Sequence, residues 1–422
     1  MNDWTRRDVL AMLGAAAVSP LVRSEGRGGA ARDAAGPGFR IRTITAGITL
    51  RGPTDTEPLH AAFAFLKGAK QTVADAGYEV QTLRIATQPL LEGASTRARA
   101  DALPALQALD RTMVAEGVLL SIGPALGPDG DDPEFPAWAA ELVRTTQNVS
   151  FTVRVASPER GASPRGVTAA GEAMVAIAHA TAGGIGNFRF AAAANVPAGT
   201  PFFPVAYHNG SDAVAIGLES PPVLSAAFAG ANTLAEAKQR LTQSLESRLG
   251  PLERLMRSVA HHDERAYLGI DVSPAPGKDA SIGEAIEALT GVPFGSASTL
   301  AGCAAITDVL KSLRVKTCGY SGLMLPVLED PVLAQRATEG RFSVRELLLY
   351  SSVCGTGLDV VPLAGDTPAD RLAGLIVDMA ALSTKLRKPL SARLFPVPGR
   401  KVGEVAKFAN PYLTDCAVMK LE

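Results

Sequence analysis

Apolar positions follow two alternating periods along the chain from Phe39 onward. In one kind of segment, apolar side chains occupy nearly every position or every second one, which is typical of strands. These predicted strands are Phe39–Leu50, Val80–Thr87, Val118–Ile122, Val149–Val155, Phe188–Asn195, Tyr267–Val272, Leu390–Phe395 and Thr414–Leu421. In the other kind, apolar residues recur every three or four positions, which is typical of helices. The predicted helices are Pro58–Gly77, Ala100–Glu116, Phe135–Thr146, Gly166–Ala182, Thr299–Leu313, Val344–Tyr350 and Thr367–Leu386. Because such alternation favours parallel strands covered by helices, the sequence predicts an α/β fold.

The middle of the chain departs from this alternation. Two β-rich runs, Phe202–Tyr207 and Ala213–Leu218, flank His208–Asp212, whose Asn-Gly pair predicts an inserted β-hairpin. A helix that starts at Thr233–Glu236, which has capping-box spacing, is expected to run to Leu249, because a Gly-Pro pair follows. No linker interrupts the chain after Phe39, and we therefore predict a single domain over residues 39–422.

The first residues have the features of a targeting segment. Arg6 and Arg7 precede the short apolar run Leu10–Val22, an arrangement typical of twin-arginine export signals. Gly26–Gly38 is rich in glycine and alanine and reads as a linker. We expect residues 1–38 to be signal and linker, the twin-arginine export machinery to be a partner, and the mature protein to be periplasmic. A frayed amphipathic helix with two chance arginines is the alternative.

Composition excludes some classes of partner. The 422 residues carry 41 Lys and Arg against 42 Asp and Glu, a formal net charge of −1, so no basic surplus is available for nucleic acid. Hydrophobic residues make up 47 % of the chain, enough for a large core, and no later uncharged segment is long enough to span a membrane. Because symmetric pairs are the commonest assemblies, we expect a homodimer.

Polar residues in or just after predicted strands are the first candidates for a site, because α/β folds place their sites there. Arg84 and Arg189 lie in strands and could bind a carboxylate, or form buried structural ion pairs. His208, at the tip of the predicted hairpin, could be a general base or an idle turn residue. Asp271, at a strand end, could contact substrate or cap the next turn.

The densest group of candidate residues lies further along the chain, in Cys318–Asp330 and Tyr350–Asp359. Cys354 directly precedes a Gly-Thr-Gly turn, whose amides could lower its pKa and make it a nucleophile. We predict a free thiol that faces an enclosed pocket. A buried cysteine in a tight turn and a disulfide with Cys318 are the alternatives. The cluster His261–Glu264 lacks metal-ligand spacing and is predicted to be a solvated helix end, so we assign no metal ligands.

Five longer segments resemble a known family. They are Asn195–His208, Leu268–Gly277, Gly319–Asp330, Val353–Asp359 and Lys388–Gly399. Together they make the chain similar to the domain-of-unknown-function 711 family, also described as a PFL-like uncharacterised family. The resemblance implies a large α/β barrel like the ten-stranded barrel of pyruvate formate-lyase-type glycyl radical enzymes, with Cys354 in its inner loop. Such enzymes carry a C-terminal glycine motif, whereas Phe408–Glu422 contains no glycine, so we do not expect radical chemistry.

These observations lead to one functional hypothesis and one alternative. We expect a non-radical enzyme, a hydrolase or a lyase, that acts on a small polar or anionic metabolite in the barrel mouth; its cofactor is not assigned. The expected catalytic residues are Cys354, His208, Asp271 and Asp359. The expected substrate-binding residues are Arg84, Arg189, Arg393, Tyr320, Ser321, Glu329 and Thr356. The alternative is a periplasmic protein that binds or senses a small molecule without turnover.

Overall fold

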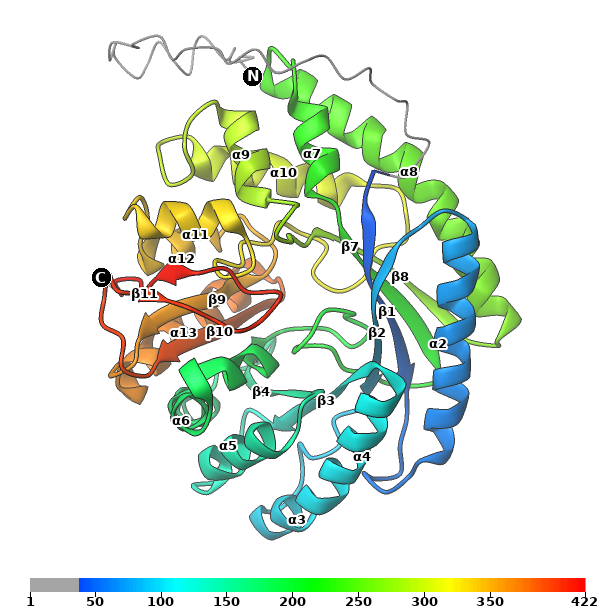
Figure 1. Ribbon diagram of the computed structural model, residues 1–422, viewed down its shortest axis with the longest axis vertical. Helices are drawn as coiled ribbons and strands as arrows, with labels where there is room; N and C mark the ends of the chain where they lie inside the picture. Colours follow the sequence, from blue (N-terminus) through cyan, green and yellow to red (C-terminus); the bar gives the residue numbers. More distant parts are fainter. Residues whose placement is uncertain (1–37, 422) are drawn as a thin grey trace.

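A computed structural model describes residues 38–421, and its centre is a mixed sheet (Figure 1). Within this range the sheet has ten strands, paired in the order β8-β7-β1-β2-β3-β4-β6-β10-β9, with β5 beside β4. The strands are β1 (Arg40–Ile48), β2 (Val80–Thr87), β3 (Val118–Leu126), β4 (Val149–Ser157), β5 (Gly161–Ala162), β6 (Phe190–Ala194), β7 (Ala213–Glu219), β8 (Ala266–Pro274), β9 (Gly357–Ala364) and β10 (Leu390–Val397). Neighbours from β1 to β6 along this path are parallel, whereas β7 and β10 run antiparallel to β1 and β6. The α/β class is confirmed.

Helices cover the outer side of the sheet (Figure 1). They are α2 (Glu57–Asp75), α3 (Thr96–Asp101), α4 (Leu103–Glu116), α5 (Phe135–Thr145), α6 (Pro164–Ala180), α7 (Pro221–Phe228), α8 (Leu234–His262), α9 (Ile282–Thr290), α10 (Thr299–Ser312), α11 (Pro331–Thr338), α12 (Val344–Tyr350) and α13 (Ala369–Leu386). A 3-10 segment, η1 (Ala182–Arg189), precedes β6. In α2 the buried residues Leu59, Phe63, Leu66 and Val73 follow the helical spacing of the sequence and pack on β1 and β2.

The connection between β6 and β7 runs along the inner side of the sheet, and the predicted hairpin is wrong. Residues 202–207 form no strand, and β7 pairs with β1 and β8 instead. The hydroxyls of Thr45 and Ser121, on the inner faces of β1 and β3, donate hydrogen bonds to carbonyls of this connection at 3.0 and 2.6 Å. These bonds satisfy carbonyl groups of a connection that contains three prolines and is therefore poorly suited to pair as a strand.

Two strand glycines make room for that inner connection. A Cβ on Gly47 of β1 would lie 2.3 Å from Nδ1 of His208, and one on Gly217 of β7 would lie 2.7 Å from Cζ of Phe202. Both distances are far shorter than van der Waals contact allows. The absence of a side chain at these two positions therefore lets the connection pack directly against the strands.

The segment 316–327 lies between β8 and β9, the two ends of the strand path. On one side Ile270 of β8 donates to the Lys316 carbonyl at 2.9 Å, and Cys318 donates to the Ile270 carbonyl at 3.1 Å. On the other side Val327 donates to the Asp359 carbonyl of β9 at 3.1 Å. The segment is irregular apart from isolated bridges to these strands. Within residues 38–421, the edge strands β8 and β9 do not pair with each other, so the strands do not form a closed barrel.

Several element boundaries differ from the sequence prediction. The helix α8 continues through Pro251, because Leu249, Leu252 and Met256 keep its buried face and compensate for the lost hydrogen bond. The strand β9 and the helix α11 were not predicted as elements. Only Cys416–Ala417 of the last predicted strand is paired, as β12, with β11 (Val405–Ala406).

The predicted solvated end of the long helix is confirmed, since α8 ends at His262 with both histidines exposed. The predicted signal and linker at residues 1–38 lie almost entirely outside the described residues. Within the described part of the chain, no helix combines the length and the apolar character needed to cross a membrane.

Candidate functional site

A cavity of about 250 Å³ lies on the inner side of the sheet. The strands β1, β2, β3, β4, β9 and β10 contribute to its wall, together with η1, the inner connection, the segment 316–327 and the loop before β12. The charged or ionisable residues that line it are Arg42, Arg84, Arg189, Tyr320, Glu329, Asp359, Arg393 and Tyr412. The larger apolar side chains are Leu119, Phe188, Phe202, Phe203 and Met324. The cavity therefore combines a cluster of charges with an apolar surface, as small-molecule sites do.

Buried charges on one side of the cavity form a continuous chain of ion pairs. Arg42 donates to Glu219 and to Glu329, in both cases at 2.9 Å. Arg393 donates to the other oxygen of Glu329 at 2.7 Å and to Asp359 at 2.5 Å. All five side chains are buried. Each of these two arginines is thus bound to two carboxylates, and its charge is compensated within the protein.

Arg84 differs from the other two cavity arginines. Its side chain is buried, with 7 % of the residue exposed, but no carboxylate of the described residues lies within ion-pair distance. Nε donates to Oγ1 of Thr82 at 3.1 Å, and the guanidinium lies 4.9 Å from the ring centre of Phe203. Burial, together with the charge of Arg42, lowers the pKa of Arg84 to about 9. The Nη groups have no hydrogen-bond partner in the described structure, and the residue lines the cavity.

A β-bulge presents Asp359 to Arg393. Along β9 and β10, Leu358 pairs with Ala392 and Val361 with Leu394, so that Asp359 and Val360 together oppose Arg393. Val360 has φ +43°, a backbone conformation that β-branched residues rarely adopt. Burial raises the pKa of Asp359, although Arg393 acts in the opposite direction. Strained backbone and a carboxyl with a raised pKa occur together at this point of the cavity wall.

Tyr320 reaches the cavity from a loop that Asp271 holds in place. The carboxylate of Asp271 accepts hydrogen bonds from the amides of Tyr320 and Ser321, both at 2.8 Å, and from the Ser273 hydroxyl at 2.6 Å. The Tyr320 hydroxyl donates to Oγ of Ser391 at 2.7 Å. Burial raises the pKa of both Asp271 and Tyr320. Asp271 is fully buried behind the loop and does not line the cavity, so it positions Tyr320 and has no access to a ligand.

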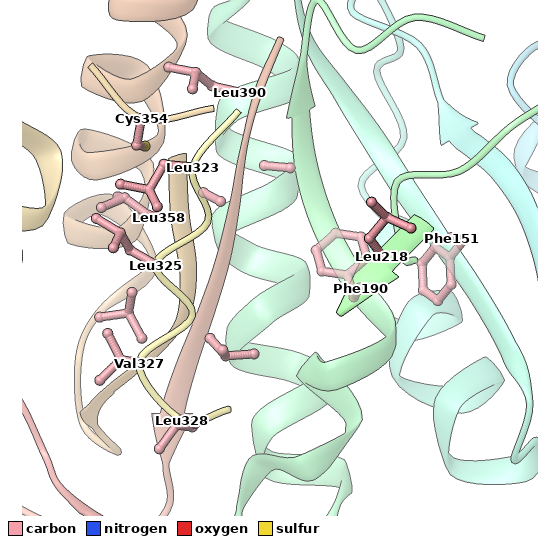
Figure 2. Close-up of a cluster of buried hydrophobic side chains, with 14 of the residues drawn as sticks. Phe151, Phe190, Leu218, Leu323, Leu325, Val327, Leu328, Cys354, Leu358 and Leu390 are labelled. Carbon is pink, nitrogen blue, oxygen red and sulfur yellow. The ribbon is translucent and has the colours of Figure 1, made fainter. Parts of the chain in front are cut away.

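Cys354 does not face the cavity. Its side chain lies in the hydrophobic core, in the same cluster as Leu323, Leu358 and Leu390 (Figure 2). The thiol is free, as are the other three cysteines of the described chain, so the structure contains no disulfide with Cys318. The predicted exposure of this thiol to a pocket is therefore wrong, and the alternative of a buried cysteine in a tight turn describes its position.

The Gly-Thr-Gly turn after Cys354 allows close backbone packing. A Cβ on Gly355 would lie 2.5 Å from Cα of Gly322, and the Gly355 amide already donates to the Leu323 carbonyl at 2.8 Å. Thr356, between the two glycines, lines the cavity, but its hydroxyl is buried without a partner in the described structure. The turn thus brings the segment 316–327 against the start of β9 and does not form an anion-binding loop.

His208 is buried against β1 and away from the cavity lining. Its ring lies over Gly47, Nε2 donates to the Gly210 carbonyl at 3.2 Å, and its amide donates to the Thr87 carbonyl at 2.8 Å. The prediction that His208 belongs to the site therefore has no support in this geometry. Its position at the end of the inner connection gives it a structural role.

This placement of His208 predicts a loss of stability in mild acid. Burial lowers the pKa of His208 below its ordinary value of 6.5. Below pH 6.5 His208 therefore binds a proton in the unfolded chain but not in the folded protein. Because of this difference, the free energy of unfolding falls as the pH decreases. Urea unfolding at pH 7.5 and pH 5.5 measures this loss. A His208→Asn variant, which cannot titrate there, should lose less stability over the same interval, and equal losses in both proteins would contradict the assignment.

The other predicted residues divide between the cavity and the surrounding structure. Arg189 touches the cavity, but its Nη groups donate to the carbonyls of Val143, Thr146 and Val149 near the end of α5. Burial lowers its pKa to about 10. Ser321 lies outside the cavity lining, with its hydroxyl bound to the Cys318 carbonyl at 2.7 Å. The predicted residues that the cavity does bring together are Arg84, Arg393, Tyr320, Glu329, Thr356 and Asp359.

Comparison with known proteins gives the same family over most of the chain. The model of the family described as "Uncharacterised ACR (DUF711)" matches residues 36–410. This chain belongs to that family. A UPF0210 protein of Pyrobaculum islandicum is 32 % identical over 392 residues, which cover 87 % of this chain and 84 % of the relative. A UPF0210 protein of Syntrophobacter fumaroxidans is 30 % identical over 405 residues, 88 % of each chain. One from Neisseria meningitidis is 28 % identical over 398 residues, again 88 % of each.

Sequence reasoning missed part of the cavity of this DUF711 protein. Arg42 carried a signal, because it is an arginine inside an otherwise apolar strand, and such a residue needs a buried partner. The aromatic side chains of the lining have no such signal in the sequence, because they come from segments far apart in the chain; they are Phe188, Phe202, Phe203 and Tyr412. No group of three His, Cys, Asp or Glu side chains that could hold a metal is found among residues 38–421.

Proposed function

We propose that this DUF711 protein binds a small organic anion in the cavity and converts it by proton transfer. The observation that carries the proposal is Arg84, a buried arginine at the cavity wall without a carboxylate partner in the described structure. An unpaired buried charge is costly, and proteins retain such groups mainly where a ligand completes the pair. Because Arg42 and Arg393 are already bound to carboxylates, Arg84 supplies the available positive charge.

The geometry around Arg84 suits a carboxylate. Thr82 binds Nε and Phe203 covers one face of the guanidinium, which together hold the group in place. The two Nη groups can then donate in parallel to both oxygens of one carboxylate, the strongest form of charged hydrogen bond. A surface lysine or a solvated arginine would lack this fixed orientation.

The proposed conversion rests on Asp359. Its carboxyl lines the cavity, its pKa is raised by burial, and the bulge at Val360 fixes its direction. A carboxyl with a raised pKa is better suited than an ordinary carboxyl to give or take a proton. Tyr320, hydrogen-bonded to Ser391, adds a hydroxyl on the same wall. A hydrolase or a lyase fits such a set, since both reactions require a positioned acid or base.

Asp359→Asn separates binding from conversion. The substitution keeps the size of the side chain but removes the titratable proton and the negative charge that Arg393 binds. Because Arg393 keeps Glu329 as a carboxylate partner, ligand binding should survive. Product formation should fall about 100-fold or more, the usual contribution of a general acid or base. We would incubate the protein with a mixture of small carboxylic acids, follow its thermal stabilisation, and identify products by mass spectrometry.

Retained turnover in Asp359→Asn would contradict the catalytic assignment. Ligands that stabilise the wild-type protein without any product would instead support a binding or sensing protein. One observation favours this second function: Cys354, His208 and Asp271, three of the residues expected to react, all lie outside the cavity. Both functions require the anion site at Arg84.

We also propose how the cavity is enclosed, where the protein is located and how it assembles. We propose that the segment 316–327 completes a barrel-like enclosure of the pyruvate formate-lyase type, supported by its hydrogen bonds to β8 and β9.

Export to the periplasm is supported by Arg6, Arg7 and the apolar run Leu10–Val22, which lie outside the described residues. A homodimer is supported by the frequency of symmetric pairs. Cell fractionation and light scattering test the last two: a cytoplasmic protein, or a particle of monomer size, would contradict them.

A further inference from the structure

We infer that the ligand of this cavity is a monocarboxylate with an apolar, ring-sized body. The inference rests on the proposed function, because it takes Arg84 as the group that binds the anion. Two further properties of the ligand are inferred: the number of charges that it carries, and the chemical character of the part of the ligand outside the carboxylate. Both follow from the side chains that surround Arg84.

The arrangement of charges selects a single carboxylate. Among the three strand arginines Arg42, Arg84 and Arg393, only Arg84 lacks a carboxylate partner in the described structure, and neither of its Nη groups has a hydrogen-bond partner there. A second carboxylate on the ligand would find Arg42 and Arg393 already bound to carboxylates and the Nη groups of Arg189 bound to backbone carbonyls. Because Arg42 and Arg393 already compensate Glu329 and Asp359, a second carboxylate would bring an unpaired charge into a small cavity, which is costly. Dicarboxylates, tricarboxylates and phosphate are therefore disfavoured.

The remaining wall is apolar and largely aromatic. Phe202 packs with Ala275 and Met324 in a separate hydrophobic cluster that borders the cavity. Beside the ion-pair chain, the rings of Phe188 and Tyr412 stack with their centres 6.5 Å apart and planes inclined by 15°, and the guanidinium groups of Arg393 and Arg42 lie over them. A ligand body that contacts these surfaces gains most by being apolar itself.

The size of the cavity limits that body. Its volume of about 250 Å³ lies below the range of roughly 300–1,000 Å³ that is typical of drug-sized ligands. One ring or a branched alkyl group with a short carboxylate arm fits such a space, and a nucleotide or an oligosaccharide does not. The cavity thus combines one bidentate anion site with one small apolar compartment.

Binding measurements with defined probes test this inference. Benzoate, phenylacetate and 3-phenylpropionate represent the inferred class, and succinate, citrate and inorganic phosphate represent the excluded ones. We would titrate each into the full chain by calorimetry and repeat the titrations with Arg84→Met. Arg51→Met is the matched control, because Arg51 is exposed and pairs with Asp55 at the surface. Tyr412→Ala, at the half-exposed rim, removes one ring without opening the core.

We expect at least one aromatic monocarboxylate to bind about 100-fold more tightly than succinate, citrate or phosphate. This binding should be lost in Arg84→Met, kept in Arg51→Met and weakened several-fold in Tyr412→Ala. Tighter binding of succinate or citrate that depends on Arg84 would overturn the inference and leave the anion site intact. Binding that is insensitive to Arg84→Met would overturn the proposed function as well. Absence of binding by every monocarboxylate probe would overturn the inference.

Discussion

Replacement of Arg84 by methionine is expected to abolish ligand binding and, at the same time, to stabilise the free protein. The wild-type residue is a buried cation without a carboxylate partner in the described structure, so removal of its charge relieves a desolvation cost. Methionine fills a similar volume, and a buried polar group without a partner costs about 1–3 kcal/mol, so we expect the free protein to be stabilised by about that amount. The same change removes the charged hydrogen bonds to a ligand and should weaken binding about 100-fold or more. Urea unfolding of the free protein and calorimetric titration measure the two effects.

Arg393→Met is the matched comparison for this result. Arg393 is equally buried, but it is bound to Glu329 and Asp359, and its loss leaves both carboxylates without that partner. We expect a destabilisation of about 3–5 kcal/mol, the cost of breaking a buried pair from one side. A similar destabilisation by Arg84→Met would show that Arg84 has a structural partner, and it would contradict the anion site.

Asp271→Ala is expected to cause a large loss of stability, although Asp271 lies outside the ion-pair chain. The carboxylate of Asp271 accepts hydrogen bonds from two amides of the Tyr320 loop and from both the amide and the hydroxyl of Ser273. All are buried, and buried donors without an acceptor cost about 1–3 kcal/mol each. Since the loop can relax in part, we expect a total of about 4 kcal/mol, measured by urea unfolding.

The control for this variant is Asp308→Ala. Asp308 is exposed and pairs with Lys238 at the surface, so its loss should cost less than about 1 kcal/mol. A stable Asp271→Ala protein that binds ligand normally but forms no product would contradict the structural role and restore Asp271 as a catalytic residue. An Asp271→Asn variant, which retains one acceptor oxygen, should fall between the alanine variant and the wild type.

The local elements follow from the sequence because their signals are local. The strand β2 spans Val80–Thr87, the same residues as its apolar run predicts. The capping pattern at Thr233 is also observed, since its hydroxyl accepts a hydrogen bond from the Glu236 amide at 3.1 Å. Periodicity and caps involve residues within a few positions of one another, so they can be read without knowledge of the fold. The inner connection was misread because Phe202–Tyr207 has the composition of a strand, whereas only its surroundings decide whether a strand partner exists.

The sequence by itself determined that charged residues of the right types occur in and after the strands, and it identified Arg84, Glu329, Asp359 and Arg393 among them. Which arginine remains available was decided only by the tertiary structure. Arg393 meets Glu329, 64 positions earlier in the chain, and Arg189 meets carbonyls near the end of α5, while no acidic side chain of the described residues reaches Arg84. A strand arginine has the same local sequence signal in all three cases, because its charge partner comes from a distant segment. The packing of those segments, and not the pattern around each arginine, separates a structural ion pair from a site for a ligand.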